Sequence, residues 1–386
     1  MPRLVYITTA GVALRNLVEG QLSYFREQGY EVYGVASPGD DLNIVGQREQ
    51  VEVVGVPMER EIRLGADLVS LWRLWRLMRR LRPDVVTAGT AKAGLLGMLA
   101  AWLARVPVRV YQLWGLRLET TTGFKRRLLN LTEQITSACS QRIICVSGSL
   151  RQSFIDCGSA KPEKTVMLLH GSCNGIDAQK YVQTEASREA GQQLRAKWNV
   201  PPDAPVIGFV GRFVRDKGIV ELVDAFDQIL ARRPDAWLLL VGDYESGDPV
   251  PEEYRRRIDQ HPRIIRPGFI QNLPPYYAAI TVMAFPTYRE GFPTVVLEAG
   301  AAELPVVAFR ATGAVDAVED GVTGLIVPLG DRQALAEGLL RYLNDPELCR
   351  QQGAAAKARV FRDFRREPLW AAMNAEFQDL LSRMGR

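Results

Sequence analysis

Short apolar runs alternate with helical patterns along almost the whole chain. Helical patterns such as Leu14–Gln28, Val220–Arg232 and Ala334–Asn344 separate thirteen strand-like runs. Apolar strands that alternate with helices are typical of parallel sheets covered on both faces, so the pattern predicts an α/β fold. The strand-like runs are Leu4–Thr9, Glu31–Ala36, Val51–Val56, Asp84–Ala88, Arg109–Leu113, Arg142–Val146, Thr165–Leu169, Val206–Gly211, Trp237–Val241, Ile264–Pro267, Ile280–Phe285, Pro305–Ala308 and Gly324–Pro328.

The strand-like runs form two series, which predict two domains. The break lies around residues 174–182, before the charged stretch Thr184–Trp198. A chain of 386 residues is long enough for two ordinary domains. We therefore predict an N-terminal domain over residues 1–180 and a C-terminal domain over residues 181–365.

Composition narrows the class of protein. An apolar fraction of 47% and a charged fraction of 24% are typical of a soluble globular protein. No apolar stretch is long enough to predict a membrane-spanning helix, and Leu4–Thr8 predicts a first strand rather than a signal peptide. The five cysteines are odd in number and lack CxxC spacing, which favours reduced thiols and a cytoplasmic location.

The net charge of +4 is unevenly distributed. Residues 1–182 hold 23 Lys and Arg against 16 Asp and Glu, whereas residues 183–386 hold 25 against 28. A basic first half favours an anionic partner, such as a lipid surface or a pyrophosphate-linked acceptor. An excess of this size also arises by chance, so both interpretations stay open; nothing indicates a nucleic-acid partner.

The stretch Leu68–Arg82 predicts an amphipathic helix. Its arginines share one face (Arg73, Arg76, Arg80), and apolar side chains line another (Leu68, Leu71, Trp72, Trp75, Met78). Such a helix either lies on an anionic membrane or packs its apolar stripe on a sheet as a crossover helix. The strand Asp84–Ala88 follows directly, which favours the crossover helix. Both interpretations hold if the apolar stripe packs on the sheet and the arginine face meets lipid. Lys125, Arg126 and Arg127 form a second basic cluster, suited to acceptor phosphate or lipid headgroups.

The segment Glu290–Glu298 combines two carboxylates, a glycine turn and a proline-led helix start. We predict Pro293 at the first helical position, where its missing N–H costs nothing. The next amides then point at an anion, which the helix dipole favours. Carboxylates accept hydrogen bonds from hydroxyls, so Glu298 suits a ribose diol and Glu290 a hexose. The alternative is a surface turn with two solvated glutamates.

Arg212 and Lys217 lie on a glycine-flanked loop after the strand Val206–Gly211. A guanidinium fork and an ammonium five positions apart can reach two phosphates from one side. The alternative is a charged turn followed by a helix start. Ligands collect at the carboxyl ends of strands in open parallel sheets, and both segments lie at such ends.

These segments resemble the retaining, nucleotide-sugar-dependent glycosyltransferases of family 4. Glu290–Glu298 is similar to their signature of two glutamates separated by seven residues, and Gly211–Gly218 to their Gly-Arg-x-x-x-x-Lys-Gly loop. Asn174–Asp177 is similar to their interdomain Asn-Gly-x-Asp, and Gly321–Val327 to the stretch after the second glutamate. The resemblance covers nearly the whole chain. It implies the GT-B fold, in which two Rossmann-like domains face each other across a cleft and the last helix, here residues 366–386, packs back on the first domain.

The resemblance implies that the second domain holds the donor. Glu290, Arg212 and Lys217 are then catalytic, and the two cations neutralise the diphosphate leaving group. The backbone of Ile270 would meet a uracil edge, whereas Asp243 either lines the nucleotide site or caps a loop. The full set of expected donor-binding residues is Glu298, Gly291, Phe292, Pro293, Thr294, Asp243 and Ile270.

The first domain would hold the acceptor, with Gly11, Arg15, Arg117 and Glu119 as candidates. The loop at Gly11 has one glycine, so it departs from the family's glycine-rich loop and is not a dinucleotide fingerprint. Arg15 either reaches a phosphate or acceptor or is a solvated first-turn arginine. Many relatives carry a histidine after the strand that here ends at Leu113, but this chain has Trp114, which argues against an imidazole base. Its two histidines are His170, placed before the Asn-Gly segment, and His261.

The expected activity is retaining transfer of a hexosyl unit, an N-acetylhexosamine or a hexose, from a UDP-sugar to an acceptor hydroxyl. The overall likeness is to bacterial enzymes that build capsule, O-antigen or other glycans on undecaprenyl diphosphate. This implies a peripheral enzyme on the inner face of the plasma membrane. Without a nucleophile to name, front-side displacement fits best. No Asp-x-Asp lies at a suitable strand end, and no His, Cys and carboxylate cluster has the spacing of metal ligands. The resemblance implies that no metal and no cofactor are required.

Other classes remain as alternatives. A sugar-nucleotide epimerase of GT-B fold needs several acidic and histidine groups, and two histidines fit this poorly. A nicotinamide dehydrogenase needs the glycine fingerprint and a later acid, which the chain lacks. A non-catalytic sugar-nucleotide sensor is open, and a product assay separates it from an enzyme.

Overall fold

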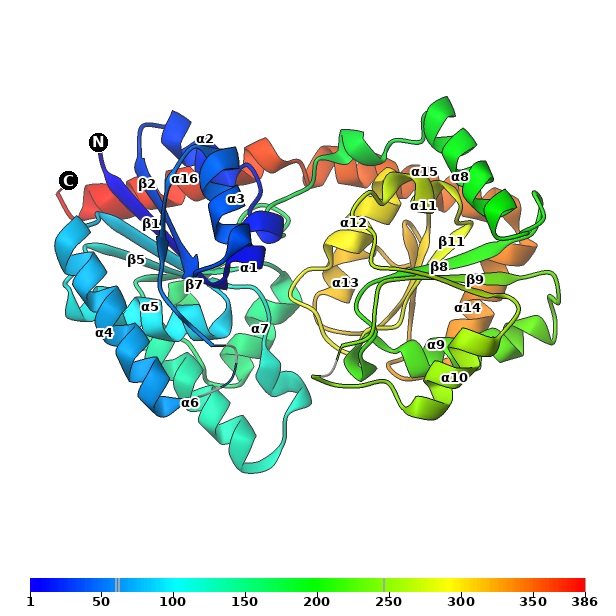
Figure 1. The fold of residues 1–386 in the computed structure, drawn as a ribbon, viewed down its shortest axis with the longest axis horizontal. Helices are drawn as coiled ribbons and strands as arrows, with labels where there is room; N and C mark the ends of the chain where they lie inside the picture. The colour runs from blue at the N-terminus through cyan, green and yellow to red at the C-terminus, as the bar shows by residue number, and fades with distance from the viewer. Residues whose placement is uncertain (60, 62, 246, 386) are drawn as a thin grey trace. The chain divides into compact units, whose positions relative to one another are not determined.

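The computed structural model describes residues 1–59, 61, 63–245 and 247–385. The chain divides into two compact units (Figure 1). Unit 1 comprises Met1–Gly175 and Arg366–Arg386, and unit 2 comprises Ile176–Arg365. The division after Gly175 lies five residues before the predicted domain boundary at 180.

Unit 1 is built on a parallel seven-stranded sheet in the order β3-β2-β1-β4-β5-β6-β7. Helices cover both faces, with α2, α3 and α16 on one side and α4, α5 and α6 on the other (Figure 1). The strands are β1 (Arg3–Ala10), β2 (Glu31–Ser37), β3 (Glu52–Gly55), β4 (Val85–Gly89), β5 (Val108–Leu113), β6 (Arg142–Cys145) and β7 (Thr165–Val166). The α-helices are α1 (Gly11–Leu17), α2 (Gln21–Glu27), α3 (Asp40–Glu49), α4 (Leu64–Leu81), α5 (Ala91–Leu103), α6 (Gly123–Cys139), α7 (Gly148–Asp156) and α16 (Arg366–Arg383).

One predicted helix of unit 1 is wrong in its extent. The pattern Leu14–Gln28 predicts a single helix, but α1 ends at Leu17 and α2 begins at Gln21. Gly20 stands between them in the left-handed conformation, with φ +79°, which no helix continues through. The apolar spacing survives the break because both helices pack on the same face of the sheet, where Leu14 and Leu22 are both buried.

The last helix of the chain completes the core of unit 1. Phe377 of α16 is fully buried and stacks on Phe25 of α2, with ring centroids 5.3 Å apart. Asn174 ties the same elements together, because its Oδ1 accepts hydrogen bonds from Trp370 Nε1 (2.7 Å) and Gln21 Nε2 (3.1 Å). The asparagine of the Asn-Gly segment therefore has a structural role.

Unit 2 is built on a parallel six-stranded sheet in the order β10-β9-β8-β11-β12-β13. Its strands are β8 (Val206–Val210), β9 (Trp237–Val241), β10 (Ile264–Gly268), β11 (Val282–Phe285), β12 (Val306–Phe309) and β13 (Gly324–Val327). Its α-helices are α8 (Glu185–Lys197), α9 (Ile219–Leu230), α10 (Glu252–Gln260), α11 (Pro274–Ala278), α12 (Thr294–Ala301), α13 (Ala314–Ala317), α14 (Arg332–Asn344) and α15 (Pro346–Asp363). Each predicted strand-like run overlaps a strand, and the predicted α/β class is confirmed.

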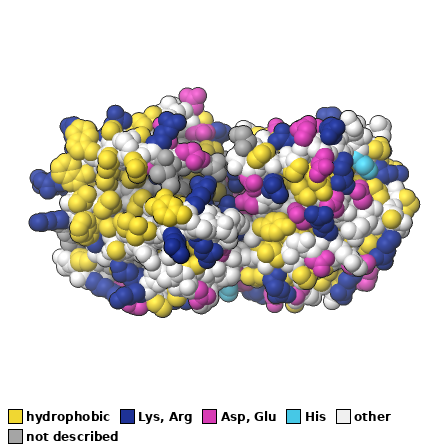
Figure 2. All heavy atoms as spheres, turned by 90° about the horizontal axis from the view of Figure 1, so that it is seen from below, with side chains coloured by type: hydrophobic (Ala, Val, Ile, Leu, Met, Phe, Trp, Pro, Cys, Tyr) yellow, Lys and Arg dark blue, Asp and Glu magenta, His cyan; other side chains and the backbone are white. Residues whose placement is uncertain are grey.

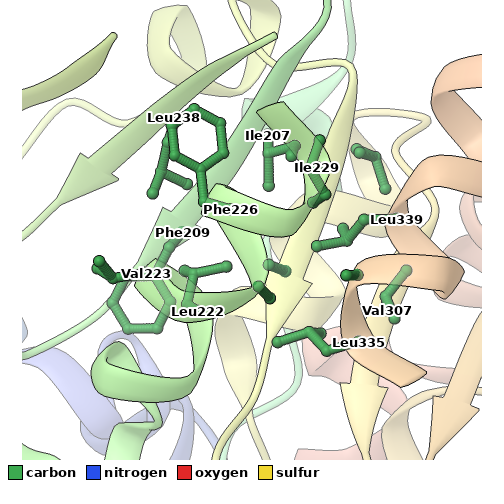
Figure 3. Close-up of a cluster of buried hydrophobic side chains, with 14 of the residues drawn as sticks. Ile207, Phe209, Leu222, Val223, Phe226, Ile229, Leu238, Val307, Leu335 and Leu339 are labelled. Carbon is green, nitrogen blue, oxygen red and sulfur yellow. The ribbon is translucent and has the colours of Figure 1, made fainter. Parts of the chain in front are cut away.

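The core of unit 2 lies between its sheet and the helices α9 and α14 (Figure 3). Phe226 and Ile229 of α9 meet Leu339 of α14 over the strand residues Ile207 and Val307, all of them fully buried. The strands and these two helices bury nearly all of their apolar side chains, which leaves the loops at the strand ends to carry polar chemistry.

Both sheets have a point at which the strand order reverses. In unit 1 the reversal lies between β1 and β4, and in unit 2 between β8 and β11. At such a point the two loops that follow the strands run in opposite directions, so a crevice forms at their carboxyl ends. Within the residues that the structure describes, no helix combines the length and the apolar character needed to cross a lipid bilayer.

Candidate active site

Two glycines allow three loops to pack closely at the carboxyl end of the unit 2 sheet. Gly218, at the start of α9, has φ +71°, and a Cβ there would lie 1.9 Å from the carbonyl oxygen of Pro286 after β11. Gly242, after β9, has φ +143°, and a Cβ there would lie 1.8 Å from the carbonyl oxygen of Gly211 after β8. Only glycine fits at both positions, so the loops after β8, β9 and β11 share one wall of the site.

Lys217 and Glu290 form an ion pair at the β8/β11 reversal. The Nζ atom of Lys217 meets Oε1 of Glu290, and both side chains are mostly buried. Thr287 Oγ1 donates a second hydrogen bond to the same carboxylate oxygen at 3.2 Å. Two predicted catalytic residues, 73 positions apart in the sequence, are thus brought into direct contact.

A second pair fixes the loops that carry this ion pair. Arg289 Nη2 lies 2.7 Å from Asp216 Oδ2, and Tyr288 N donates to the carbonyl oxygen of Asp216 at 2.9 Å. Glu290 N donates to the carbonyl oxygen of Thr312 at 3.0 Å. The backbone on both sides of Lys217 and Glu290 is therefore held in place, which preorganises the two charges.

Arg212 lies on the same loop as Lys217 but pairs with a different carboxylate. Its Nη1 lies 2.7 Å from Oε2 of Glu245, and both side chains are about half exposed. Exposed ion pairs contribute about 0–1 kcal/mol, so a phosphate could replace Glu245 at low cost. The two predicted cations thus meet carboxylates from separate loops rather than each other.

The helix α12 follows Glu290 and begins at Thr294. Pro293 is its N-cap, with φ −82° and ψ 102°, so the prediction of Pro293 as the first helical residue is wrong by one position. Its extended ψ angle keeps it outside the helix. No side chain caps α12, and its first turn holds no acidic residue. The first amides of an α-helix have no intrahelical partner, so this end is suited to an anion.

The residues between Glu290 and α12 differ in what they expose. A Cβ on Gly313 would lie 2.6 Å from the carbonyl oxygen of Gly291, so Gly291 lies tightly against the next loop. The ring of Phe292 packs on Phe364, with centroids 5.2 Å apart, which leaves only its backbone for a ligand. Thr294 is half-buried at the start of α12.

Glu298 lies on α12 and is buried. Its Oε2 accepts a hydrogen bond from the Tyr277 hydroxyl at 2.7 Å, and Tyr181 donates to the same carboxylate. Burial raises the pKa of Glu298, and the hydrogen bonds from both tyrosines partly oppose this rise. With Glu290 paired and Glu298 buried, the alternative of two solvated glutamates is wrong.

Asp243 and Ile270 lie in the loops after β9 and β10. Gly242 N donates to the carbonyl oxygen of Gly268 at 3.0 Å, which brings these loops together. Asp243 is exposed, and its Oδ1 accepts a hydrogen bond from Tyr244 N at 2.9 Å, so it caps its own loop. Ile270 is half-buried two residues after β10.

In unit 1, Gly11 and Arg15 lie beside α3. A Cβ on Gly11 would lie 2.8 Å from Leu42 N, so this glycine permits a close approach of α1 and α3. Arg15 Nη1 lies 2.9 Å from Asp41 Oδ1, so it is paired rather than freely solvated. At the β1/β4 reversal, the hydroxyls of Thr9 and Thr90 lie 2.7 Å apart.

The loop after β5 carries the other predicted acceptor residues. Trp114 covers Gly89, where a Cβ would lie 2.4 Å from the indole, and its Nε1 donates to Gln112 Oε1 at 3.1 Å. This packing gives the tryptophan a structural role at the place expected for histidine. Arg117 is exposed and Glu119 half-buried in the 3₁₀ turn Arg117–Thr120 that follows.

The two histidines lie in different surroundings. His261 Nδ1 accepts from Arg263 N at 3.1 Å, and its ring meets Phe226 edge-on. Burial lowers the pKa of His261, so the neutral ring is favoured. His170 is exposed. Among the described residues, no three His, Cys, Asp or Glu side chains gather where they could hold a metal ion.

Sequence reasoning missed the groups that hold the predicted residues in place. Tyr277 and Tyr181 fix Glu298, and Thr287 fixes Glu290. No recurring spacing in the sequence links Tyr277 and Tyr181 to Glu298. Thr287 lies only three residues before Glu290, so its hydroxyl was a local signal that could have predicted the contact.

Comparison with known proteins identifies the family of both units. Residues 204–345 match the family described as Glycosyl transferases group 1, and residues 9–171 match the Glycosyl transferase 4-like domain. The chain is similar to the capsular polysaccharide biosynthesis glycosyltransferase CapM of Staphylococcus aureus, with 35% identity over 95% of this chain and 94% of CapM. It is also similar to the Escherichia coli UDP-Gal:alpha-D-GlcNAc-diphosphoundecaprenol alpha-1,3-galactosyltransferase, with 26% identity over 75% of this chain and 74% of that enzyme.

Solved structures agree with this assignment at the level of the fold. HepE from Anabaena in complex with UDP is similar with a TM-score of 0.78 and 21% identity, over 99% of this chain and 100% of HepE. Sucrose-phosphate synthase from Thermosynechococcus elongatus is similar with a TM-score of 0.82 and 21% identity, over 99% of this chain and 100% of that one. The chain therefore belongs to the family 4 type of glycosyltransferases with the GT-B fold, and it is a glycosyltransferase.

Proposed function

We infer that this enzyme transfers a hexosyl unit from a UDP-sugar, with retention, to a hydroxyl of a lipid-linked sugar. The unit is a hexose or an N-acetylhexosamine, and the product is a bacterial surface polysaccharide or glycan. The observation that carries the proposal is the Lys217–Glu290 ion pair beside the uncapped start of α12. It combines a phosphate-binding cation, a hydroxyl acceptor and amides suited to an anion.

Each charged group has a distinct part in the proposed reaction. When the donor binds, its diphosphate replaces Glu290 as the partner of the Lys217 ammonium. It replaces Glu245 as the partner of Arg212 in the same way. Glu290 then accepts hydrogen bonds from hexose hydroxyls. As the glycosidic bond to phosphate breaks, both cations and the α12 amides stabilise the charge that develops on the leaving group.

The buried carboxylate of Glu298 is proposed to bind the ribose diol. A carboxylate offers about four lone-pair positions, so the hydrogen bonds from Tyr277 and Tyr181 leave acceptor capacity for ribose hydroxyls. The bonds from the tyrosines also fix the orientation of the carboxylate. A preoriented acceptor loses less conformational entropy when the nucleotide binds.

Front-side displacement fits the proposed retention best, because no side chain is assigned as a nucleophile. In front-side displacement the departing phosphate takes the acceptor proton while the new bond forms on the same face of the sugar. The charges of Lys217 and Arg212 replace a divalent ion in this proposal, so neither metal nor cofactor is required.

The proposed acceptor is an undecaprenyl-diphosphate-linked sugar at the cytoplasmic face of the plasma membrane. Two similar proteins support it, since one is a galactosyltransferase that acts on GlcNAc-diphosphoundecaprenol and CapM is a glycosyltransferase of capsular polysaccharide biosynthesis. The basic first half of the chain, with 23 Lys and Arg against 16 Asp and Glu in residues 1–182, suits an anionic acceptor.

Donor class and catalytic role are tested together. UDP should raise the melting temperature of the wild-type chain more than GDP or ADP does, because a ligand that binds the folded state stabilises it. With the preferred UDP-sugar and a lipid-linked acceptor, Lys217→Ala should lower kcat/KM at least about tenfold. Lys197→Ala changes an exposed lysine of the same unit and should leave kcat/KM unchanged.

Two results would contradict the proposal. One is a larger stabilisation by GDP or ADP than by UDP. The other is a normal transfer rate in both Lys217→Ala and Glu298→Ala. Addition of EDTA tests the metal independence separately, because a metal-dependent enzyme would lose its activity.

A further inference from the structure

Three adjacent helices of unit 1 expose an apolar surface. The helix α5 packs against both α4 and α6. Among the described residues, twenty large hydrophobic side chains are exposed, and ten of them lie on these three helices. Figure 2 shows hydrophobic side chains gathered with Lys and Arg on this unit. We call these ten side chains the three-helix surface: Leu64, Leu68, Val69, Trp72, Trp102, Leu103, Phe124, Leu128, Leu131 and Ile135.

The exposed side chains of α4 follow the helical repeat. Leu64, Leu68 and Trp72 lie four residues apart and form one stripe along the outside of the helix. The opposite side buries Leu74 and Leu77. The prediction that Leu68 and Trp72 belong to the stripe that packs on the sheet is therefore wrong, and α4 is apolar on two sides.

The polarity of α6 is the reverse of that of an ordinary crossover helix. Its exposed stripe consists of Phe124, Leu128, Leu131 and Ile135, whereas Glu133, Thr136 and Ser137 are buried. A helix on the surface of a soluble protein normally buries its apolar stripe and exposes its polar one. The apolar stripe of α6 therefore lies on the outside of unit 1, where it is available for contact with a partner.

The charge around the three-helix surface is strongly positive. The helices α4, α5 and α6 together hold eight Lys and Arg against two acidic residues. One of the eight, Lys92, is neutralised by Asp67 at 2.7 Å, and Glu133 is buried, so the seven Lys and Arg of α4 and α6 remain in excess at the surface. The guanidinium of Arg76 lies 4.7 Å from the Trp72 ring centre, so cation and aromatic side chain are presented together.

We propose that the three-helix surface lies on the surface of an anionic lipid bilayer. Its apolar side chains enter the boundary between headgroups and acyl chains, and the surrounding Lys and Arg meet lipid phosphates. A second copy of the chain fits this surface poorly, because a twofold contact would bring two strongly basic faces together. The surface belongs to unit 1, so its binding to lipid does not depend on the donor site of unit 2.

Flotation of the whole chain with vesicles tests this proposal without any nucleotide sugar. The protein should float with vesicles of phosphatidylglycerol and phosphatidylcholine, and much less with phosphatidylcholine alone. High salt should weaken the binding, because it screens the attraction of Lys and Arg to the lipid phosphates. Double replacement Lys125→Gln with Arg127→Gln should weaken binding to the anionic vesicles several-fold, since both side chains are exposed.

The apolar part is tested by a triple variant, Leu68→Ser with Phe124→Ser and Leu131→Ser. Each of these side chains is at least half exposed, so the fold should remain. Vesicle binding should fall at least about tenfold, because less apolar area enters the bilayer. The matched control is Val322→Ser with Leu329→Ser and Met384→Ser, three exposed apolar residues elsewhere, which should bind as wild type.

The same proteins are also tested for UDP binding by thermal shift. A wild-type chain that floats but does not respond to UDP would support the membrane surface and contradict the proposed donor site. Failure of the wild type to float with anionic vesicles, or equal flotation of the triple-serine variant, would overturn the membrane proposal. It would also be overturned by light scattering that shows a wild-type dimer and a monomeric triple-serine variant, because the occupant would then be a second copy.

Discussion

At the residue scale, two tyrosines set the properties of Glu298. In sequence it is the second glutamate of a pair with no indication of its surroundings. In the structure it is buried on α12, and burial raises its pKa, while hydrogen bonds from Tyr277 and Tyr181 oppose the rise. The tyrosines therefore help to keep the carboxylate ionised, which is the form that the proposed hydrogen bonds from ribose hydroxyls require.

We predict that Tyr277→Phe weakens UDP binding about fivefold, a cost of about 1 kcal/mol, because the Glu298 carboxylate loses the hydrogen bond that fixes its orientation. Removal of this donor raises the pKa of Glu298 further, because one of the bonds that favour the ionised form is lost. As the pH falls, the affinity for UDP should therefore begin to decrease at a higher pH in the variant than in the wild type. Isothermal titration calorimetry with UDP over a pH series measures both effects.

Tyr276→Phe is the matched control for this experiment. Tyr276 is the neighbouring tyrosine, half-buried against Trp198, with ring centroids 5.9 Å apart. Its replacement should leave the affinity and its pH dependence unchanged. Equal pH profiles for wild type and Tyr277→Phe would show that Tyr277 does not control the ionisation of Glu298.

At the element scale, α6 has an unusual buried side. Glu133 faces Tyr111 of β5, and burial raises the pKa of this carboxyl to about 7, although the hydrogen bond from Tyr111 opposes the rise. One oxygen of Glu133 has no hydrogen-bond partner among the described residues. The folded protein therefore binds this proton more tightly than the unfolded chain does, and the stability contribution of Glu133 falls as the pH rises from about 4.5 to about 7.

We predict that Glu133→Gln removes this pH dependence. Between pH 5.5 and pH 8.5 the wild type should lose on the order of 2 kcal/mol of unfolding free energy through Glu133, whereas the variant should not. Urea unfolding of both proteins at the two pH values measures the difference. Glu163→Gln, at an exposed position, is the control, and an equal loss in all three proteins would exclude Glu133 as the cause.

Other elements show which structural features a local sequence pattern can predict. The strand runs were predictable because buried parallel strands are continuously apolar. The split between α1 and α2 was not, since both helices keep their apolar residues on the side of the sheet and Gly20 is a weak signal inside a helical pattern. The start of α12 was displaced by one residue because proline suits both the N-cap and the first helical position, and ψ decides between them.

At the scale of the whole molecule, the chain builds two separate cores. The core of unit 1 needs α16, which lies almost 200 residues after the rest of that unit, since unit 1 resumes at Arg366 after Gly175. The core of unit 2 is formed by its own sheet with α9 and α14. Each unit therefore has the apolar interior that a cooperative folding unit requires.

We predict that the two units respond separately to core truncation. Phe377→Ala should lower the melting transition of unit 1, and Phe226→Ala that of unit 2, since each removes a fully buried ring at a cost of about 3–5 kcal/mol. Differential scanning calorimetry of the two variants measures which transition moves. If both variants shift one common transition equally, the units unfold as a single cooperative body.

The sequence by itself determined the α/β class, the two strand series, the family and the loops that bear chemistry. These features depend on local periodicity or on residues close together in the chain, such as Arg212 and Lys217 with the glycines that flank them. The tertiary structure alone decided that Lys217 contacts Glu290, that Glu298 is buried beside Tyr277, and that Asn174 secures α16.

The physical reason is the same in each case. A periodic pattern shows that a helix has an apolar side, but only packing decides which side meets the sheet, as the exposed Trp72 on α4 shows. Likewise, a charge in the sequence has no partner until the chain brings distant loops together. The site was therefore predictable as a set of loops, whereas its pairs, their burial and the resulting pKa values depended on the folded chain.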